Sequence, residues 1–297
     1  MSNVDQLPAT GVEDSHDSVI DIAGGVRELT TKGWPEGYTY GATRYADVVL
    51  KECFPDRCRN IVSALLQFKP TLKELRQGGG GRTIFVRRFD DSLAGMKEDG
   101  DEIWGKQNIT IAKSLSLDGK SIRTSRTRGH EIDMFGKGSL SQAIPGIAVE
   151  MEWNNKDPFF DRDLINFQAL HREGAIAIGI IVTRGPRLQD VIGPTVRSKD
   201  GGNKFGQSTT HWEKLIPKVN LGGGGECPLL LVGIEPERID GIELAFRVKK
   251  RLEKAYEFKS NWKNSHKAWK GDAERAYKTM VENAKELMPP LKEVQSK

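Results

Sequence analysis

The stretch Gly146-Ile147-Ala148-Val149-Glu150-Met151-Glu152-Trp153-Asn154 alternates in a way that is typical of a β-strand. Successive side chains of a strand point to opposite faces, so Glu150 and Glu152 share one face with Ala148, and the apolar residues between them point to the other. Two acids spaced in this way lie about 7 Å apart at their Cα atoms, by the rise of a strand. The stretch therefore predicts a strand beside the core that offers two carboxylates to one divalent cation.

A third acid, Asp133, lies upstream in a second predicted strand, His130-Glu131-Ile132-Asp133-Met134-Phe135. Carboxylates suit a hard cation such as Mg²⁺, and acids left charged and unpaired at one place would repel one another. We therefore expect Asp133 and Glu150 to bind a metal, while Glu152 orients or deprotonates a water in phosphodiester hydrolysis. The strand alone supports an alternative equally well, in which Glu150 and Glu152 form the solvent face of an edge strand and pair with Lys156 or with arginines.

Apolar runs predict the rest of the sheet. Residues 175–183 are almost wholly apolar, as in strands that are covered on both faces, and residues 229–234 form a similar run. A helix predicted at 161–173 links two of these strands into a crossover unit. The sequence therefore predicts an α/β fold with a mixed central β-sheet flanked by helices.

The chain outside these strands is predicted to be mainly helical. Residues 45–75 show helical spacing of apolar positions, and residues 242–288 predict helices with a break near 260–265. Residues 83–86 read as a strand. The four glycines at 78–81 predict a flexible join, with a phosphate loop as the sharper alternative, although no Lys-Ser/Thr pair follows them.

The predicted organisation is a disordered acidic leader at 1–25 and a single nuclease domain at 26–297. This domain comprises an N-terminal helical layer, a catalytic core at about 83–235 and C-terminal helices at about 240–290. Lysines and tryptophans near the C-terminus form either a basic arm or the solvated face of a helix. They are Lys259, Trp262, Lys263, Lys267, Trp269 and Lys270.

The composition excludes several classes of protein. The chain has 297 residues, 37% hydrophobic and 29% charged, without a long apolar run or a signal-peptide pattern. Its three cysteines lack the spacing of zinc ligands, and their odd number argues against a disulfide framework. The net charge is +4, with acids gathered in the first 30 residues and lysines in the last fifty. We therefore expect a cytoplasmic protein, and this charge distribution fits a polyanionic partner.

Several segments around the acids carry a family resemblance. Ile132-Asp133-Met134-Phe135 precedes Ile147-Ala148-Val149-Glu150-Met151-Glu152, with Glu150 seventeen residues after Asp133. The run Glu152-Trp153-Asn154-Asn155-Lys156-Asp157-Pro158-Phe159-Phe160-Asp161-Arg162-Asp163-Leu164 is more specific than the acids alone. These segments resemble type II restriction endonucleases of the BamHI and BglII group, in the PD-(D/E)XK nuclease superfamily. The resemblance is densest from about 129 to 235.

The resemblance implies a restriction-endonuclease-like core and a homodimer that cuts double-stranded DNA at a short palindrome, leaving 5′-phosphate and 3′-hydroxyl ends. It implies Mg²⁺ as the cofactor, with Mn²⁺ as a substitute, held by Asp133, Glu150 and the backbone carbonyl of Met151. It also implies a partner DNA methyltransferase in the cytoplasm of a prokaryote. Glu152 stands where the superfamily usually has lysine, as in BamHI-like enzymes, so the role of that lysine does not carry over.

Two clusters of polar residues are candidates for holding DNA, since phosphate contacts and base contacts draw on different side chains. Basic and hydroxyl residues at 123–128 precede the metal strand and suit phosphates, or they form an exposed hairpin without a role. Residues 184–211 offer donors and acceptors for bases, or residues 208–210 only cap a helix that begins near a solvated His211. The candidates are Arg123, Arg126, Arg128, Asn154, Asn155, Lys156, Arg184, Asn203, Lys204, Ser208, Thr209, Thr210 and His211.

Two further functions remain open on the sequence alone. The chain could be a DNA-binding protein that has kept a nuclease fold but lost catalysis, in which case salt-sensitive binding occurs without cutting. It could also be a repair or recombination nuclease that recognises DNA structure, which would produce random ends or prefer branched substrates. Discrete fragments from plasmid DNA and Mg²⁺ would favour the site-specific endonuclease.

Overall fold

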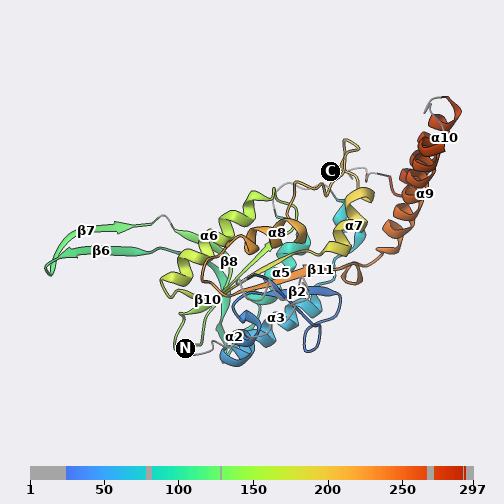
Figure 1. Cartoon of the computed structure of the whole chain (residues 1–297). Coiled ribbons are helices and arrows are strands. Elements are labelled where there is room, and N and C mark those ends of the chain that lie inside the picture. The colour runs from blue at the N-terminus through green and yellow to red at the C-terminus, as the bar shows by residue number, and fades with distance from the viewer. Residues whose placement is uncertain (1–24, 78–81, 128, 266–270, 290, 292–297) are drawn as a thin grey trace, which may run out of the picture.

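One mixed seven-stranded β-sheet forms the centre of the part of the chain that the structure describes (Figure 1). The computed structural model describes residues 25–77, 82–127, 129–265, 271–289 and 291. The strand order is β1-β2-β11-β10-β9-β8-β5, so the predicted α/β fold with a mixed sheet and flanking helices is confirmed. The strands are β1 (Arg27–Leu29), β2 (Tyr38–Ala42), β5 (Trp104–Ile109), β8 (His130–Gly136), β9 (Gly146–Glu152), β10 (Ile176–Arg184) and β11 (Leu229–Ile234).

Strand β9 lies inside the sheet. It pairs parallel with β10, where Glu150 lies opposite Ile181, and antiparallel with β8, where Val149 lies opposite Met134. A pairing partner on each side excludes the edge-strand interpretation of the two glutamates. Helix α6 (Pro158–Arg172) connects β9 to β10 as the predicted crossover, beginning with a proline, whose fixed φ suits the first helical turn.

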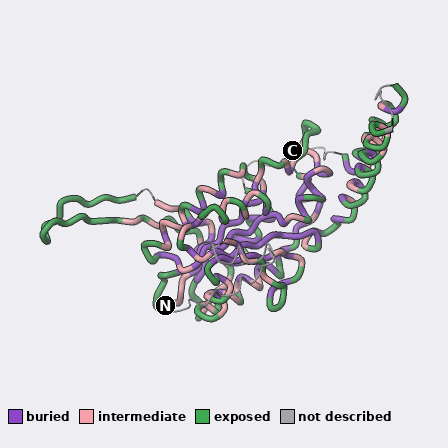
Figure 2. Tube along the Cα trace, in the orientation of Figure 1, coloured by how far each residue is buried: buried purple, intermediate pink, exposed green. Residues whose placement is uncertain are grey.

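Two hydrophobic clusters cover the two faces of the sheet. Ala148 packs in the cluster with α6 and α8 (Trp212–Asn220), whereas Ile147 and Val149 pack in the larger cluster on the other face. The alternation along β9 therefore divides its side chains between the two faces as predicted. Figure 2 shows the buried strands enclosed between exposed helices.

The larger cluster includes the remaining helices. The predicted strand at 83–86 is wrong, because Phe85, Phe89 and Leu93 recur at helical spacing and bury one face of a helix. The predicted break near 260–265 lies a few residues too early, since one helix runs to Ser265 and the next begins at Asp272. These helices are α2 (Ala46–Cys53), α3 (Pro55–Gln67), α4 (Leu72–Arg76), α5 (Ile84–Ala94), α7 (Pro186–Thr195), the 3₁₀-helix η1 (Pro236–Arg238), α9 (Glu243–Ser265) and α10 (Asp272–Glu286).

A two-stranded ribbon of β6 (Ala112–Leu117) and β7 (Lys120–Arg126) extends away from the body (Figure 1). All residues of both strands are exposed, as Figure 2 shows in green. The turn at Asp118 and Gly119 joins the two strands, with φ values of 48° and 76° that suit a tight hairpin. A second, short hairpin pairs β3 (Lys97–Glu98) with β4 (Asp101–Glu102).

Some predictions fall on parts of the chain outside the described residues. These are the acidic leader, apart from residue 25, and the glycines at 78–81. Among the helices that are described, none is both long enough and apolar enough to cross a membrane.

Candidate active site

Strands β8 and β9 bring the three predicted acids to one place. The backbone N–H of Asp133 donates a hydrogen bond to Oε1 of Glu150 at 3.1 Å. Glu150 and Glu152 are only 3% and 2% exposed, and Asp133 is half-buried beside them. The carboxylates therefore gather at the carboxyl end of β9, on the face that α6 covers.

A fourth acid, Asp163 of α6, faces the same strand and is 1% exposed. The sequence analysis did not single it out, although a signal was present. Phe160, Asp163, Leu164 and Phe167 follow the spacing i, i+3, i+4, i+7, so Asp163 stands on the apolar face of the helix. A carboxylate on the helix face that packs against the sheet has to lie close to the side chains on that face of the sheet, which here include Glu150 and Glu152.

Burial and mutual repulsion keep these acids from ionising easily. Burial first, and then the charges of Asp133 and Asp163, raise the pKa of the Glu150 carboxyl well above its ordinary value. Burial and Asp163 raise the pKa of Glu152 to about 8, and burial also raises the pKa of Asp163. Such a set of carboxyls favours any cation that relieves the repulsion.

Two arginines and one amide pair with the acids. Arg82 contacts Asp133 at 2.9 Å and Asp90 of α5 at 2.5 Å. Arg162 of α6 contacts Asp163 at 2.7 Å and Glu152 at 3.2 Å. The side chain of Asn155 donates to Oε2 of Glu152 at 2.5 Å. The alternative that arginines pair with these glutamates is thus correct for Glu152, although the strand is an interior one.

The donor atoms at this place fit a hard divalent cation. They are carboxylate oxygens, which Mg²⁺ and Mn²⁺ prefer, and their repulsion is the kind that a cation relieves. Within the described residues, no three acids, histidines or cysteines stand in a ready metal-binding group. Arg82 and Arg162 instead hold Asp133 and Glu152 in ion pairs.

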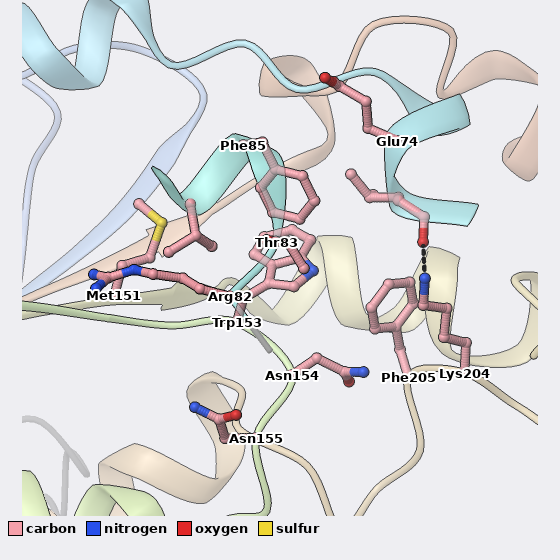
Figure 3. A pocket seen from close by; sticks show the side chains of 12 residues that line it. Glu74, Arg82, Thr83, Phe85, Met151, Trp153, Asn154, Asn155, Lys204 and Phe205 are labelled. Carbon is pink, nitrogen blue, oxygen red and sulfur yellow. Dashed lines mark hydrogen bonds between the residues drawn. The ribbon is translucent and has the colours of Figure 1, made fainter. Parts of the chain in front are cut away.

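A pocket of about 260 Å³ opens beside the end of β9 (Figure 3). It brings together three of the predicted DNA-binding residues, Asn154, Asn155 and Lys204, and Arg82 also lines it. Its aromatic wall includes Trp153, whose ring meets Phe85 and Phe205 edge to face. The pocket therefore offers amides and cations next to the acids.

Lys204 is tied to the end of α4. Its Nζ donates to the carbonyl of Leu75 at 2.7 Å, the dashed line in Figure 3, and also to the carbonyl of Gln77. Burial lowers the pKa of Lys204 to about 8. Lys204 thus provides hydrogen-bond donors to the carbonyls at the carboxyl end of α4 and also lines the pocket.

Three of the residues predicted to read bases are fully buried. Arg184, Thr210 and His211 are 0% exposed, which conflicts with direct base contact. The Arg184 guanidinium donates to the carbonyl of Thr210 at 2.6 Å, to Gln189 at 2.5 Å and to Thr209 at 2.5 Å. Arg184 therefore holds the 203–211 segment in place from beneath.

The same segment is fastened to the strand end that carries the acids. The Thr210 N–H donates to the carbonyl of Asn155 at 2.8 Å, and the Asp157 N–H donates to that of Ser208 at 3.1 Å. His211 is the residue before α8, as predicted, but it is buried instead of solvated, and no side-chain capping bond is present at this helix. The capping alternative is therefore wrong for the described residues.

The other predicted DNA-binding residues lie in different places. Lys156 and Ser208 are exposed near the acids, and Asn203 is exposed beside Arg197, with which it forms a hydrogen bond. Arg123 and Arg126 belong to the projecting ribbon and thus lie apart from the acids, and Arg128 lies outside the described residues.

Comparison with known proteins identifies the family. The sequence profile described as restriction endonuclease BglII/BglIII matches residues 38–234, which is more than half of the chain and includes all four acids. A comparison with curated proteins gave no match. The enzymes of this family are type II restriction endonucleases, which cut DNA. The chain belongs to the restriction endonuclease BglII/BglIII family and is a type II site-specific deoxyribonuclease.

Proposed function

We propose that the protein hydrolyses phosphodiester bonds of double-stranded DNA at a short palindromic site in a Mg²⁺-dependent reaction that leaves 5′-phosphate and 3′-hydroxyl ends. The observation that carries this proposal is the buried Glu150 carboxyl, which accepts a hydrogen bond from Asp133 and is repelled by the charges of Asp133 and Asp163. A divalent cation at this point would relieve the repulsion that burial intensifies.

Each acid has a separate proposed role. Asp133, Glu150 and the backbone carbonyl of Met151 would hold Mg²⁺, or Mn²⁺ in its place. When bound, the ion lowers the pKa of a coordinated water and offsets charge that develops on the phosphate. Glu152 receives the proton of the attacking water or orients it, since Asn155 and Arg162 fix its two oxygens.

The proposed DNA contacts fall into two groups. Asn154, Asn155 and Lys204 line the pocket beside the acids, and Lys156 follows Asn155 in the chain, so these residues would position the backbone that is cut. Asn203, Ser208 and Thr209 belong to the segment held by Arg184 and would face the bases. Arg123, Arg126 and Arg128 are proposed to contact phosphates farther along the duplex.

The biological setting is also a proposal. A palindromic site would be read by a homodimer, because the two-fold symmetry of the protein then matches that of the site. A DNA methyltransferase would protect the same site in a prokaryotic cytoplasm. We further propose that residues 26–297 form one nuclease domain, as the sequence predicts.

The test of this function is digestion of plasmid and phage DNA followed by sequencing of the ends. We expect discrete fragments whose ends share one short palindrome and carry 5′-phosphates. Random ends would favour a structure-specific nuclease, and salt-sensitive binding without any cutting would favour a protein that has lost catalysis.

Removal of divalent metal is expected to stop cleavage. In EDTA the rate should fall below detection, because the water and the phosphate lose the charge that activates them. Addition of Mg²⁺ or Mn²⁺ to the same sample should restore it, as gel electrophoresis of plasmid DNA would measure. Full activity in excess EDTA would rule out the metal-dependent mechanism.

Asp163→Asn is expected to lower cleavage roughly 10- to 100-fold, the size of effect that residues behind metal ligands usually have. The amide removes a negative charge that faces Glu150 and Glu152 and weakens the hold on Arg162. Initial rates on plasmid DNA at saturating Mg²⁺ would measure the loss. Asp161→Asn is the matched control, because Asp161 is two residues away and pairs at the surface with Lys218. If Asp163→Asn cleaves as fast as Asp161→Asn and wild type, Asp163 is not part of the site.

A further inference from the structure

A stripe of basic residues follows one face of helix α9. Arg247, Lys250, Arg251 and Lys254 stand at positions i, i+3, i+4 and i+7, so their side chains leave the helix on the same side. All four residues are exposed. Together with Leu244 and Leu287 they line a groove of about 550 Å³. We call these four residues the α9 stripe.

The α9 stripe differs from Lys249 of the same helix in its lack of acidic partners within the described residues. Lys249 pairs with Asp190 and with Glu253, and Lys259 lies over the ring of Tyr277. No residue of the stripe forms an ion pair with any described part of the chain. Four like charges on two helical turns repel one another, so the stripe gains when an anion approaches.

The opposite face of α9 is accounted for by packing. Ala245, Val248, Leu252 and Ala255 are buried and belong to the hydrophobic core or lie against it. This face packs on α7 and α10, while the exposed stripe borders the groove that Leu287 lines at the carboxyl end of α10. The charges are therefore not needed to hold the helix, which makes a ligand outside the described chain the best reason for them.

The start of α9 lies near the end of the sheet where the acids are, at the carboxyl ends of β9, β10 and β11. In the sheet, Glu152 pairs with Thr183 of β10, and the next residue, Arg184, pairs with Ile234, the last residue of β11. The chain leaves β11 at this edge and reaches α9 through η1. Since strands are about 4.8 Å apart, β11 is about 10 Å from β9, which is less than the width of a DNA duplex.

The helix then projects from the body, as Figure 1 shows at the upper right. Its 23 residues span roughly 35 Å, which is about one turn of DNA. The acids and the start of α9 share this end of the sheet, although α9 packs on the opposite face, so a duplex that crosses the strand ends past β11 would pass the start of α9. The matching anionic surface is the row of phosphates along the duplex, with one charge per about 1.7 Å of its axis.

We propose that the α9 stripe binds the phosphate backbone of the substrate duplex outside the recognition site and so strengthens binding without regard to sequence. The helix lies beyond residues 38–234, which match the family profile. The proposal rests on DNA as the substrate, and it requires neither the metal nor the roles given to the acids.

The test compares duplex length, salt and the α9 stripe in one binding experiment. The stripe variant carries Arg247→Ala, Lys250→Ala, Arg251→Ala and Lys254→Ala, changes that suit exposed positions of a helix. Fluorescence anisotropy without Mg²⁺ would give Kd for random-sequence duplexes of about one and about four helical turns across a range of NaCl concentrations. Circular dichroism and the unfolding midpoint would establish that the variant keeps its fold.

We expect wild type to bind the long duplex more tightly than the short one, by more than the larger number of overlapping binding positions on the long duplex explains. The stripe variant should lose about tenfold or more on the long duplex, with a log Kd against log salt slope lower by about 3, and little on the short one. Two double variants, each of which removes one arginine and one lysine, serve as a matched comparison. The first carries Arg251→Ala and Lys254→Ala within the stripe, and the second carries Arg172→Ala and Lys97→Ala outside it. Only the first pair should weaken binding to the long duplex.

Three results would overturn the proposal. One is a stripe variant with wild-type affinity and salt slope on both duplexes. The second is an equal loss for the two matched pairs, which would indicate only a general effect of net charge. The third is a change of molar mass in light scattering without a change in DNA binding, because a second copy of the chain would then be the occupant. None of these results depends on cleavage, so a failure of this binding proposal can be told apart from a failure of the proposed catalytic function.

Discussion

Glu150→Gln should reduce DNA cleavage by roughly 10³-fold or more while leaving a protein at least as stable as the wild type. The amide has nearly the same shape as the carboxyl but cannot supply the negative oxygen that the proposed metal requires. Stability should not fall, because the Glu150 carboxyl is buried and repelled by Asp133 and Asp163, so its charge gives the fold no support. Cleavage rates with Mg²⁺ and the thermal unfolding midpoint measure the two effects on one sample.

The control for this variant is a second buried glutamate. Glu235 is 0% exposed and accepts hydrogen bonds from Thr39 at 2.5 Å and from the Leu188 N–H at 3.0 Å, and burial raises its pKa as well. Glu235→Gln should leave cleavage within about twofold of wild type, yet lower the unfolding midpoint, because an amide is a weaker acceptor. If Glu150→Gln cleaves like wild type, the metal site proposed at the end of β9 is wrong.

Arg184→Met should lower the free energy of unfolding by at least about 3 kcal/mol, the usual effect of removing one partner from a buried charged network. Methionine fills much of the volume but leaves the Thr210 carbonyl and the Gln189 side chain without their donor. The 203–211 segment would then lose the hydrogen bonds that hold it from beneath. Urea unfolding followed by tryptophan fluorescence measures the change.

Arg187→Met is the matched comparison, since Arg187 is 60% exposed and pairs with Glu237 at the surface. It should change the free energy of unfolding by less than about 1 kcal/mol. The opposite outcome for Arg184→Met would be a variant that keeps the wild-type unfolding midpoint and cuts plasmid DNA at additional sites. That outcome would support the direct base contact that the sequence suggested for Arg184.

The strands and their faces could be predicted from local pattern, because a period of two fixes which side chains share a face. The two glutamates and the apolar residues between them illustrate this. The segment at 83–86 shows the limit of such reasoning. Its β-branched and aromatic residues favour a strand, but the apolar positions that follow at 89 and 93 make a helix the better way to bury them.

The surroundings of the acids were harder to predict, because they come from distant parts of the chain. Arg82 reaches Asp133 from 51 residues away, and no local spacing indicates that contact. The residues around Arg184 have the donors that base reading needs, but only the packed structure reveals that a residue is buried. Asp163 is the exception, since the helical pattern around it was sufficient.

The exposed β6–β7 ribbon has a consequence for how copies of this protein behave in a concentrated solution. Each of its strands has one neighbour within the described residues, so the outer backbone donors and acceptors are open to another chain. Leu115, Leu117 and Ile122 add exposed apolar surface to this open edge. The positive charges of Lys120, Arg123 and Arg126 oppose the approach of an identical ribbon. The residues that suit a phosphate backbone thus also protect the enzyme against aggregation through this edge.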